Sequence, residues 1–209
     1  MERISFAEHF DDEQGNSMAK EPITRFKELL AQAEQLGTSP HNAAALATAG
    51  NDLEPTVRMV LLKGVDDRGF VFYTNLESRK ARQLADNRRA SLCFWWPQLK
   101  RQVRVEGVAE LVNDQEADEY FASRPRGSQI AAWASRQSRE LASRQELLGM
   151  VADLTARYED QPVPRPPHWS GYRLVPERIE FWKEQPDRLH EREVYTRQPS
   201  GWKITLLAP

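Results

Sequence analysis

The sequence has little that could build a disulfide, a metal centre or a common nucleotide-binding loop. Cys93 is the only cysteine among 209 residues, which excludes an intrachain disulfide and a cysteine-built metal centre. It lies in the apolar run SLCFWW, where a buried small side chain is a more frequent role than a reactive thiol. The four histidines are scattered without ligand spacing, so no metal site is predicted. Walker, GxGxxG and GxSxG motifs are missing too, which argues against P-loop, Rossmann and serine-hydrolase enzymes.

Excess charge of one sign and long apolar runs are also missing. The formal net charge is −2, so the molecule as a whole has no strong attraction for nucleic acid or for an anionic membrane. No apolar stretch approaches membrane-spanning length, and the acidic start MERISFAEHFDDEQGN does not resemble a secretory signal. We therefore expect a cytoplasmic protein that binds neither nucleic acid nor membrane. Any site for an anion must be local.

What is present predicts one domain, residues 21–209, after a polar and mobile segment at residues 1–20. Pro22 opens an amphipathic helix that stops at Gly37. Three apolar runs between residues 42 and 75 indicate a β-meander, and further strands and helices alternate along the rest of the chain. Six or more antiparallel strands interrupted by helices favour a mainly β fold, a small barrel with helices packed around it.

Basic residues gather in four places. Residues 187–192 read DRLHER, and in an extended chain Arg188, His190 and Arg192 would project from one face. Such crowding is unfavourable unless an anion lies opposite. Arg58 and Lys63 flank the apolar run of a predicted strand, and their different parity places them on different faces. The alternative for DRLHER is a strand edge paired with Glu180 or Glu184, and the alternative for Arg58 and Lys63 is solvated charges at the two ends of a strand.

The two remaining clusters resemble phosphate sites. Ser78 is a candidate N-cap for a helix whose first residues are Arg79 and Lys80, and a phosphate bound there would turn an unfavourable pair of cations into a favourable one. Tyr120 and Arg124 lie four residues apart on one helix face, with Ser128 four further along. A solvated basic face and a surface hydrogen-bond network are the alternatives. Four such clusters in a slightly acidic chain favour phosphate binding.

These residues carry a family likeness. RMVLLK, FYTN, SRKA, RQVRVEG, YFASRPRGSQIAAWASRQS, IEFW, RLHER and WKITLLAP resemble, in order and spacing, the pyridoxamine 5′-phosphate oxidase family, from about Ala43 to the C-terminus. The resemblance implies a six-stranded antiparallel split β-barrel, homodimeric, with FMN at the subunit interface. It implies an FMN-dependent oxidase that converts pyridoxamine or pyridoxine 5′-phosphate to pyridoxal 5′-phosphate, with O2 as acceptor and H2O2 as product.

The resemblance also implies roles for individual residues. Arg188 and His190 are the implied catalytic residues, which hold the pyridine ring against the flavin. The implied substrate-binding residues are Lys63, Tyr120, Arg124, Ser128, Arg188, Leu189 and His190. The implied FMN-binding residues are Arg58, Met59, Val60, Leu61, Leu62, Lys63, Tyr73, Thr74, Arg79, Lys80, Gln102, Gln137, Ser138, Trp182 and Arg192.

The likeness is incomplete at both ends of the chain. The Arg-Arg/Lys-x-Tyr motif of the family's N-terminal arm is not found before the first helix, and LLAP replaces an arginine-containing ending. Rival interpretations are a sister flavoenzyme of the phenazine-biosynthesis type, a non-catalytic flavin or pyridoxal phosphate carrier, and a nucleic-acid binder using RKARQLADNRR. The phosphate clamp of Tyr120, Arg124 and Ser128 argues against the first, intact RLHER against the second, and the balanced charge against the third.

Overall fold

The computed structural model describes residues 21–209, so the segment 1–20 that we expect to be mobile lies outside the described residues. None of the helices in this described part is long and apolar enough to cross a lipid bilayer. The elements in chain order are α1 Pro22–Gln35, β1 Ala43–Ala49, β2 Pro55–Leu61, β3 Gly64–Asp66, β4 Gly69–Asn75, α2 Arg79–Asp86, β5 Arg89–Trp96, β6 Arg101–Leu111, α3 Asp114–Ser123, α4 Arg126–Ala134, α5 Arg144–Arg157, β7 Trp169–Lys183, β8 Glu191–Gln198 and β9 Gly201–Leu206.

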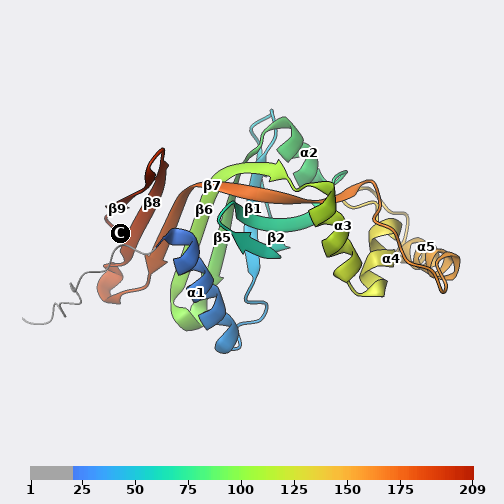
Figure 1. Cartoon of the computed structure of the whole chain (residues 1–209), viewed down its shortest axis with the longest axis horizontal. Coiled ribbons are helices and arrows are strands. Elements are labelled where there is room, and N and C mark those ends of the chain that lie inside the picture. Colours follow the sequence, from blue (N-terminus) through green and yellow to red (C-terminus); the bar gives the residue numbers. More distant parts are fainter. Residues whose placement is uncertain (1–20) are drawn as a thin grey trace, which may run out of the picture.

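The strands in residues 21–209 form one antiparallel sheet of nine strands, in the order β2-β1-β5-β6-β7-β4-β3. Strand β8 also pairs with β7, and β9 pairs with β8. The long strands β6 and β7 cross the middle of the molecule (Figure 1). The prediction of a mainly β, antiparallel fold with peripheral helices is confirmed. The pairings of the predicted β-meander are confirmed, because β2 pairs with β1 and β3 pairs with β4, but its second apolar run is divided into the two strands β2 and β3. The sequence did not predict that β4 also pairs with β7. Alternating apolar residues identify a strand, but they do not identify its partner.

Helix α1 covers one face of this sheet and closes the main core (Figure 1). Its Phe26 is fully buried, and the ring lies 4.9 Å from Phe70 and 4.8 Å from Phe94, centroid to centroid. Burial of each such side chain contributes roughly 2–3 kcal/mol. The predicted start of this helix at Pro22 is confirmed, and the helix ends at Gln35. The core fixes β4, one of the strands that flank the site described below.

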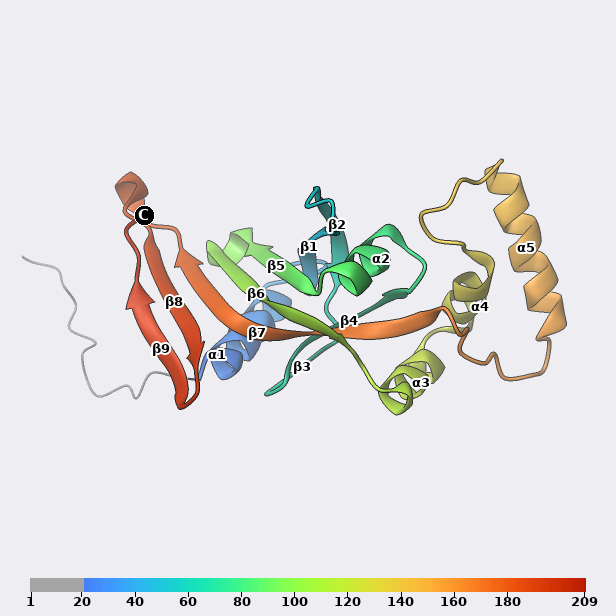
Figure 2. The ribbon, with the colours of Figure 1, turned by 90° about the horizontal axis from the view of Figure 1, so that it is seen from above.

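Helices α3, α4 and α5 lie at one end of the molecule, and β8 and β9 lie at the other (Figure 2). A separate apolar cluster around Phe121, Ile130, Val163 and Trp169 holds the three helices together. Asn113 caps α3 by accepting a hydrogen bond from the Glu116 backbone nitrogen at 2.8 Å, a role for which asparagine is favoured. The apolar cluster therefore fixes the position of α3 and α4 relative to β7.

The stretch DRLHER is not extended, and this prediction is wrong. Pro186–Arg188 forms a short 3-10 turn, Asp187 and Arg188 have φ values of 55° and 61°, and β8 begins only at Glu191. Pro186 favours a turn at this point, and the turn separates Arg188 and His190 from the ladder that carries Arg192. Arg188, His190 and Arg192 therefore do not share a strand face.

Candidate active site

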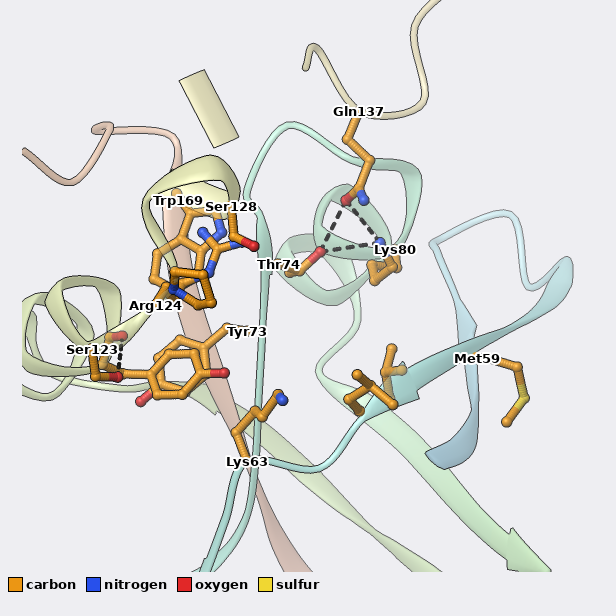
Figure 3. A pocket seen from close by; sticks show the side chains of 14 residues that line it. Met59, Lys63, Tyr73, Thr74, Lys80, Ser123, Arg124, Ser128, Gln137 and Trp169 are labelled. Atoms are coloured by element: carbon orange, nitrogen blue, oxygen red, sulfur yellow. Dashed lines mark hydrogen bonds between the residues drawn. The ribbon is translucent and has the colours of Figure 1, made fainter. Parts of the chain in front are cut away.

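A cavity of about 420 Å³ opens between β2, β4, α2 and the α3–α4 corner (Figure 3). It brings together side chains from residues 59 to 169, far apart in the sequence. Eleven of the residues implied by the family resemblance line it, from both the cofactor and the substrate sets. The lining residues are Met59, Val60, Leu61, Lys63, Tyr73, Thr74, Lys80, Tyr120, Ser123, Arg124, Pro125, Ser128, Gln137 and Trp169.

Lys80 marks one side of the cavity. It lies in the first turn of α2, which Ser78 caps by accepting from the Ala81 backbone nitrogen, as predicted. The Lys80 ammonium donates to Thr74 Oγ1 at 3.0 Å, to Gln137 Oε1 at 3.0 Å and to Ser78 Oγ at 3.3 Å. All three acceptors are neutral. Burial, together with the nearby guanidinium of Arg58, lowers the pKa of Lys80 to about 8.

Arg58 supplies a second cation behind Lys80, although its side chain does not line the cavity. Its guanidinium donates to Leu46 O at 3.1 Å, to Thr48 Oγ1 at 2.6 Å and to the hydroxyl of Thr56. Burial, and then the charge of Arg79, lowers the pKa of Arg58. Three cations, Arg58, Arg79 and Lys80, therefore raise the positive potential at the start of α2.

Arg124 marks the other side of the cavity (Figure 3). Its guanidinium carbon lies 4.8 Å from the ring centre of Trp169, which is a cation–π contact. Nη1 of Arg124 is buried and has no hydrogen-bond partner within residues 21–209. Burial lowers the pKa of Arg124. Buried donors are nearly always satisfied in proteins, so this nitrogen indicates an anion that belongs here.

Stacked aromatic rings form the wall between these two sides. The ring of Tyr73 lies 4.0 Å from that of Tyr120 and 5.2 Å from that of Trp169, nearly parallel to both. Gly171 pairs with Tyr73 in the β4–β7 ladder, and a Cβ at Gly171 would come within 2.8 Å of the Tyr73 ring. A glycine is needed there so that the tyrosine can lie flat against β7.

The cations of this cavity lack acidic partners. Within the described residues, Lys63, Lys80, Arg58 and Arg124 take part in no ion pair, whereas Arg79, exposed outside the cavity, has Glu54 at 3.9 Å. Burying a charge away from water without a counter-ion is unfavourable. The arrangement therefore suits a ligand with two separate anionic groups, or two anionic ligands bound side by side.

A second group of implied site residues lies at the opposite end of the sheet, near β8 (Figure 2). Arg188 and Leu189 are exposed. The ring of His190 lies 4.6 Å from that of Trp182, and its Nδ1 accepts from the Gln185 backbone nitrogen at 3.2 Å. Trp182 is paired in register with Gln102. A single chain therefore does not bring this group to the cavity.

Three other implied residues do not line the cavity. Leu62 is buried in the main core, and Ser138, with a φ of 67°, lines a separate cavity between α4 and α5. Arg192 belongs to the distant group, where its Nε donates to Glu180 at 3.0 Å and its Nη1 to Ala208 O at 3.0 Å. The FMN contacts assigned to these residues stay predictions.

Comparison with known proteins agrees with this arrangement. A family model described as pyridoxamine 5′-phosphate oxidase matches residues 30–158, and a second, described as the pyridoxine 5′-phosphate oxidase C-terminal dimerisation region, matches residues 169–209. The chain belongs to the pyridoxamine 5′-phosphate oxidase family. The boundary between the two matches falls in the segment that joins α5 to β7.

Curated members of the pyridoxamine 5′-phosphate oxidase family are similar over nearly the whole chain. A pyridoxine/pyridoxamine 5′-phosphate oxidase of Myxococcus xanthus (strain DK1622) is 56% identical over 189 residues, which is 90% of this chain and 92% of the relative. One of Rhizobium meliloti (strain 1021) is 52% identical over 193 residues, 91% of this chain and 94% of the relative.

Solved structures share the fold of this pyridoxamine 5′-phosphate oxidase family member. PhzG from Burkholderia lata 383, solved in complex with tetrahydrophenazine-1-carboxylic acid, superposes with a TM-score of 0.87 at 37% identity, covering 92% of this chain and 95% of that one. A pyridoxamine 5′-phosphate oxidase-related, FMN binding protein from Nostoc punctiforme has a TM-score of 0.71 at 16% identity, covering 89% and 96%. The latter supports the fold alone.

Several residues at the site were not anticipated from the sequence. Trp169, Ser123 and Pro125 line the cavity, and the last two flank Arg124 in SRPRGS, which was a usable signal. Nothing local marked Trp169, which starts β7 after a proline-rich segment. Gln83 lies three residues after Lys80 and hence on the same face of α2. This spacing alone does not indicate a role, because the partners of Gln83 are Thr48 on β1 and Thr56 on β2.

Proposed function

We propose that this protein is an FMN-dependent oxidase that converts pyridoxamine 5′-phosphate or pyridoxine 5′-phosphate to pyridoxal 5′-phosphate, with O2 as electron acceptor and H2O2 as by-product. The observation that carries the proposal is one cavity with two groups of cations, around the buried Lys80 and around the half-buried Arg124, neither of which forms an ion pair within residues 21–209. Two phosphorylated molecules account for both groups, because guanidinium groups and helix N-termini bind phosphate well.

FMN fits the Lys80 side. Lys80, Thr74, Gln137 and the first turn of α2 would hold its phosphate, with Arg58 adding positive charge from behind. The strand residues Met59 to Leu61 would lie along the remainder of the molecule. FMN, when bound, would supply the two-electron acceptor that side chains cannot provide. The protein's part is to bind, orient and shield.

The substrate phosphate fits the Arg124 side. Nη1 of Arg124 has a free donor there, and Ser128, Tyr120 and Lys63 line the same wall. Fixing the phosphate at this end would place the pyridine ring near Tyr73, whose ring is stacked on that of Tyr120. The substrate ring would then lie between the Arg124 side and the proposed flavin site. Holding two reactants in a fixed relation is a large part of catalytic rate enhancement. Arg188, whose side chain is exposed and forms no ion pair within residues 21–209, would stabilise negative charge that develops on the ring.

We propose that two chains are needed to bring Arg188 and His190 to the cavity, as a homodimer with FMN at the interface. The match of residues 169–209 to a dimerisation region supports this. An exposed apolar row on β2, with Val57 at 69% and Met59 at 64% exposure, supports it as well, because a partner would cover such a row. Each cavity would then be completed by the C-terminal end of the other chain.

Mixing two inactive variants tests the homodimer. Arg124→Ala damages the cavity half and Arg188→Ala damages the C-terminal half. After the two are unfolded and refolded together, about one quarter of the sites would be intact, because half of the dimers are mixed and each has one undamaged site. Oxidase activity should return to roughly that fraction of wild type. No recovery, with mixed dimers demonstrated by differently tagged chains, would contradict a site shared between subunits.

A sister flavin oxidase acting on a phenazine precursor is the second candidate, favoured by the superposition on PhzG. The Arg124 side of the cavity distinguishes the two, because an aromatic carboxylic acid has no phosphate for Tyr120, Arg124 and Ser128 to bind. The direct test is to purify the protein, record its flavin spectrum, and follow peroxide after adding pyridoxamine 5′-phosphate in air. We expect peroxide with the phosphorylated substrate and none with pyridoxamine. Bound flavin without peroxide would refute the proposed reaction and point to the sister enzymes or to a carrier.

A further inference from the structure

A chain of neutral hydrogen-bonding groups connects α2 to β1 and β2 directly behind Lys80. Gln83 follows Lys80 by three residues on α2 and is buried, with 7% of its surface exposed. Its Oε1 accepts a hydrogen bond from Thr48 Oγ1 at 2.8 Å and another from Thr56 Oγ1 at 2.6 Å. One amide oxygen therefore ties the helix to two neighbouring strands.

These contacts fix the direction of the two threonine hydroxyls. A hydroxyl group has a single proton to donate, and the shortest donor contacts of Thr48 and Thr56 are those to Gln83. The remaining alternatives, between the two threonines, measure 3.3 and 3.4 Å. With their protons committed to Gln83, both oxygens offer lone pairs to the Arg58 guanidinium, which donates to each of them.

Within residues 21–209, the result is that Arg58 donates hydrogen bonds only to neutral oxygens. Its other acceptors are the backbone oxygens of Leu46 and Thr56, at 3.1 and 3.3 Å. Burial and then the positive charge of Arg79 lower the pKa of Arg58, and burial and then the positive charge of Arg58 lower the pKa of Lys80. Neutral acceptors orient the guanidinium without cancelling its charge, which a carboxylate in the same place would do.

We propose that Gln83 is a positioning residue for the cofactor phosphate: it orients Thr48 and Thr56 so that Arg58 is held beside Lys80 with its positive charge uncompensated. This inference rests on the FMN-binding function proposed above. It assigns a role to a residue that touches neither the cavity nor any ligand. It also explains why an amide, and not a carboxylate, occupies this buried position on α2.

The test compares FMN with riboflavin, which has the same ring system and no phosphate. Affinities of the apoprotein for both are measured by quenching of flavin fluorescence at pH 7. Gln83→Met keeps the length and apolar packing of the side chain but removes the acceptor, and we expect FMN to bind about ten-fold more weakly. Riboflavin affinity should stay within about two-fold. The matched control is Gln32→Met, an exposed glutamine of α1, which should change neither affinity.

Gln83→Glu separates orientation from charge. It keeps an acceptor for both threonines and adds a negative charge beside Arg58, so FMN binding should weaken further while riboflavin binding is retained. Thr56→Val removes one of the two hydroxyls from the other side and should reproduce the selective loss if Gln83→Met does not fold. Equal losses for FMN and riboflavin, or no loss for either, overturn the inference. A wild-type protein that fails to bind FMN would instead defeat the proposed function itself.

Discussion

The buried ammonium of Lys80 makes FMN affinity depend on pH in a window that the structure defines. Burial and the charge of Arg58 lower the pKa of Lys80 from 10.5 to about 8 in the ligand-free protein. A shift of this size corresponds to about 3 kcal/mol of unfavourable free energy for holding the charged form in the fold. A phosphate dianion placed at this ammonium removes the cause, because it supplies the missing counter-charge.

The direction in which stability and FMN affinity change with pH follows from the number of protons that each state binds. Between about pH 8 and pH 10.5 the ligand-free protein has lost the Lys80 proton, whereas the unfolded chain and the FMN complex retain it. The apoprotein should therefore gain stability from this group as pH rises through that window, since the penalty exists only while Lys80 is charged. FMN binding should take up a proton there, and affinity should fall by up to about ten-fold per pH unit above pH 8.

Calorimetric titration of the apoprotein with FMN, in two buffers of different ionisation enthalpy at each pH from 7 to 9.5, measures both affinity and proton uptake. The control is Lys80→Met, which should bind FMN weakly and without pH dependence in this range. A wild-type affinity that stays constant from pH 7.5 to 9.5, or a slope that persists in Lys80→Met, would refute the reasoning.

Three further variants test the remaining assignments. Arg124→Met should raise KM for pyridoxamine 5′-phosphate by about 100-fold in steady-state assays and leave bound FMN unchanged, because only the substrate phosphate loses its guanidinium. A loss of FMN instead would contradict the assignment of the Arg124 side to the substrate and the Lys80 side to FMN. Arg188→Ala should lower kcat by about 100-fold with FMN retained, and undiminished turnover would contradict its role. Glu180 is 2% exposed and accepts hydrogen bonds from Arg104, Arg178 and Arg192. Glu180→Gln should therefore lower the free energy of unfolding, measured in urea, by about 3 kcal/mol. A change below about 1 kcal/mol, as for exposed ion pairs, would show that these ion pairs do not stabilise the fold.

The local parts of the site could be predicted from the sequence. The cap at Ser78 and the two cations after it follow from a three-residue pattern, and the spacing of Tyr120 and Arg124 follows from one helical turn. These features depend on neighbours in the chain, which periodicity and capping rules describe well. The family resemblance then supplied the ligand for patterns that, taken alone, fit a solvated surface equally well.

The predictions that failed concern features that depend on contacts between distant residues or on turns. The partner of β4 is β7, about one hundred positions later in the chain, and no local rule selects it. DRLHER reads as a strand by alternation, yet Pro186 and the positive φ of Asp187 and Arg188 place it in a turn. The Gln83 contacts required the register of β1 against β2, in which Thr48 is opposite Thr56.

A distinction between two kinds of arginine emerges from the whole molecule. Arg173 and Arg165, which attach α3 to β7 and to the segment before it, are each held by two carboxylates, as are many structural arginines. Among the described residues 21–209, Arg58 and Arg124 have only neutral or aromatic partners. A carboxylate stabilises an arginine at the expense of its attraction for other anions. Arg192, whose Nε is bonded to Glu180, belongs to the first kind. Its contact with FMN would therefore add orientation more than charge, and the phosphate should depend chiefly on Arg58 and Lys80.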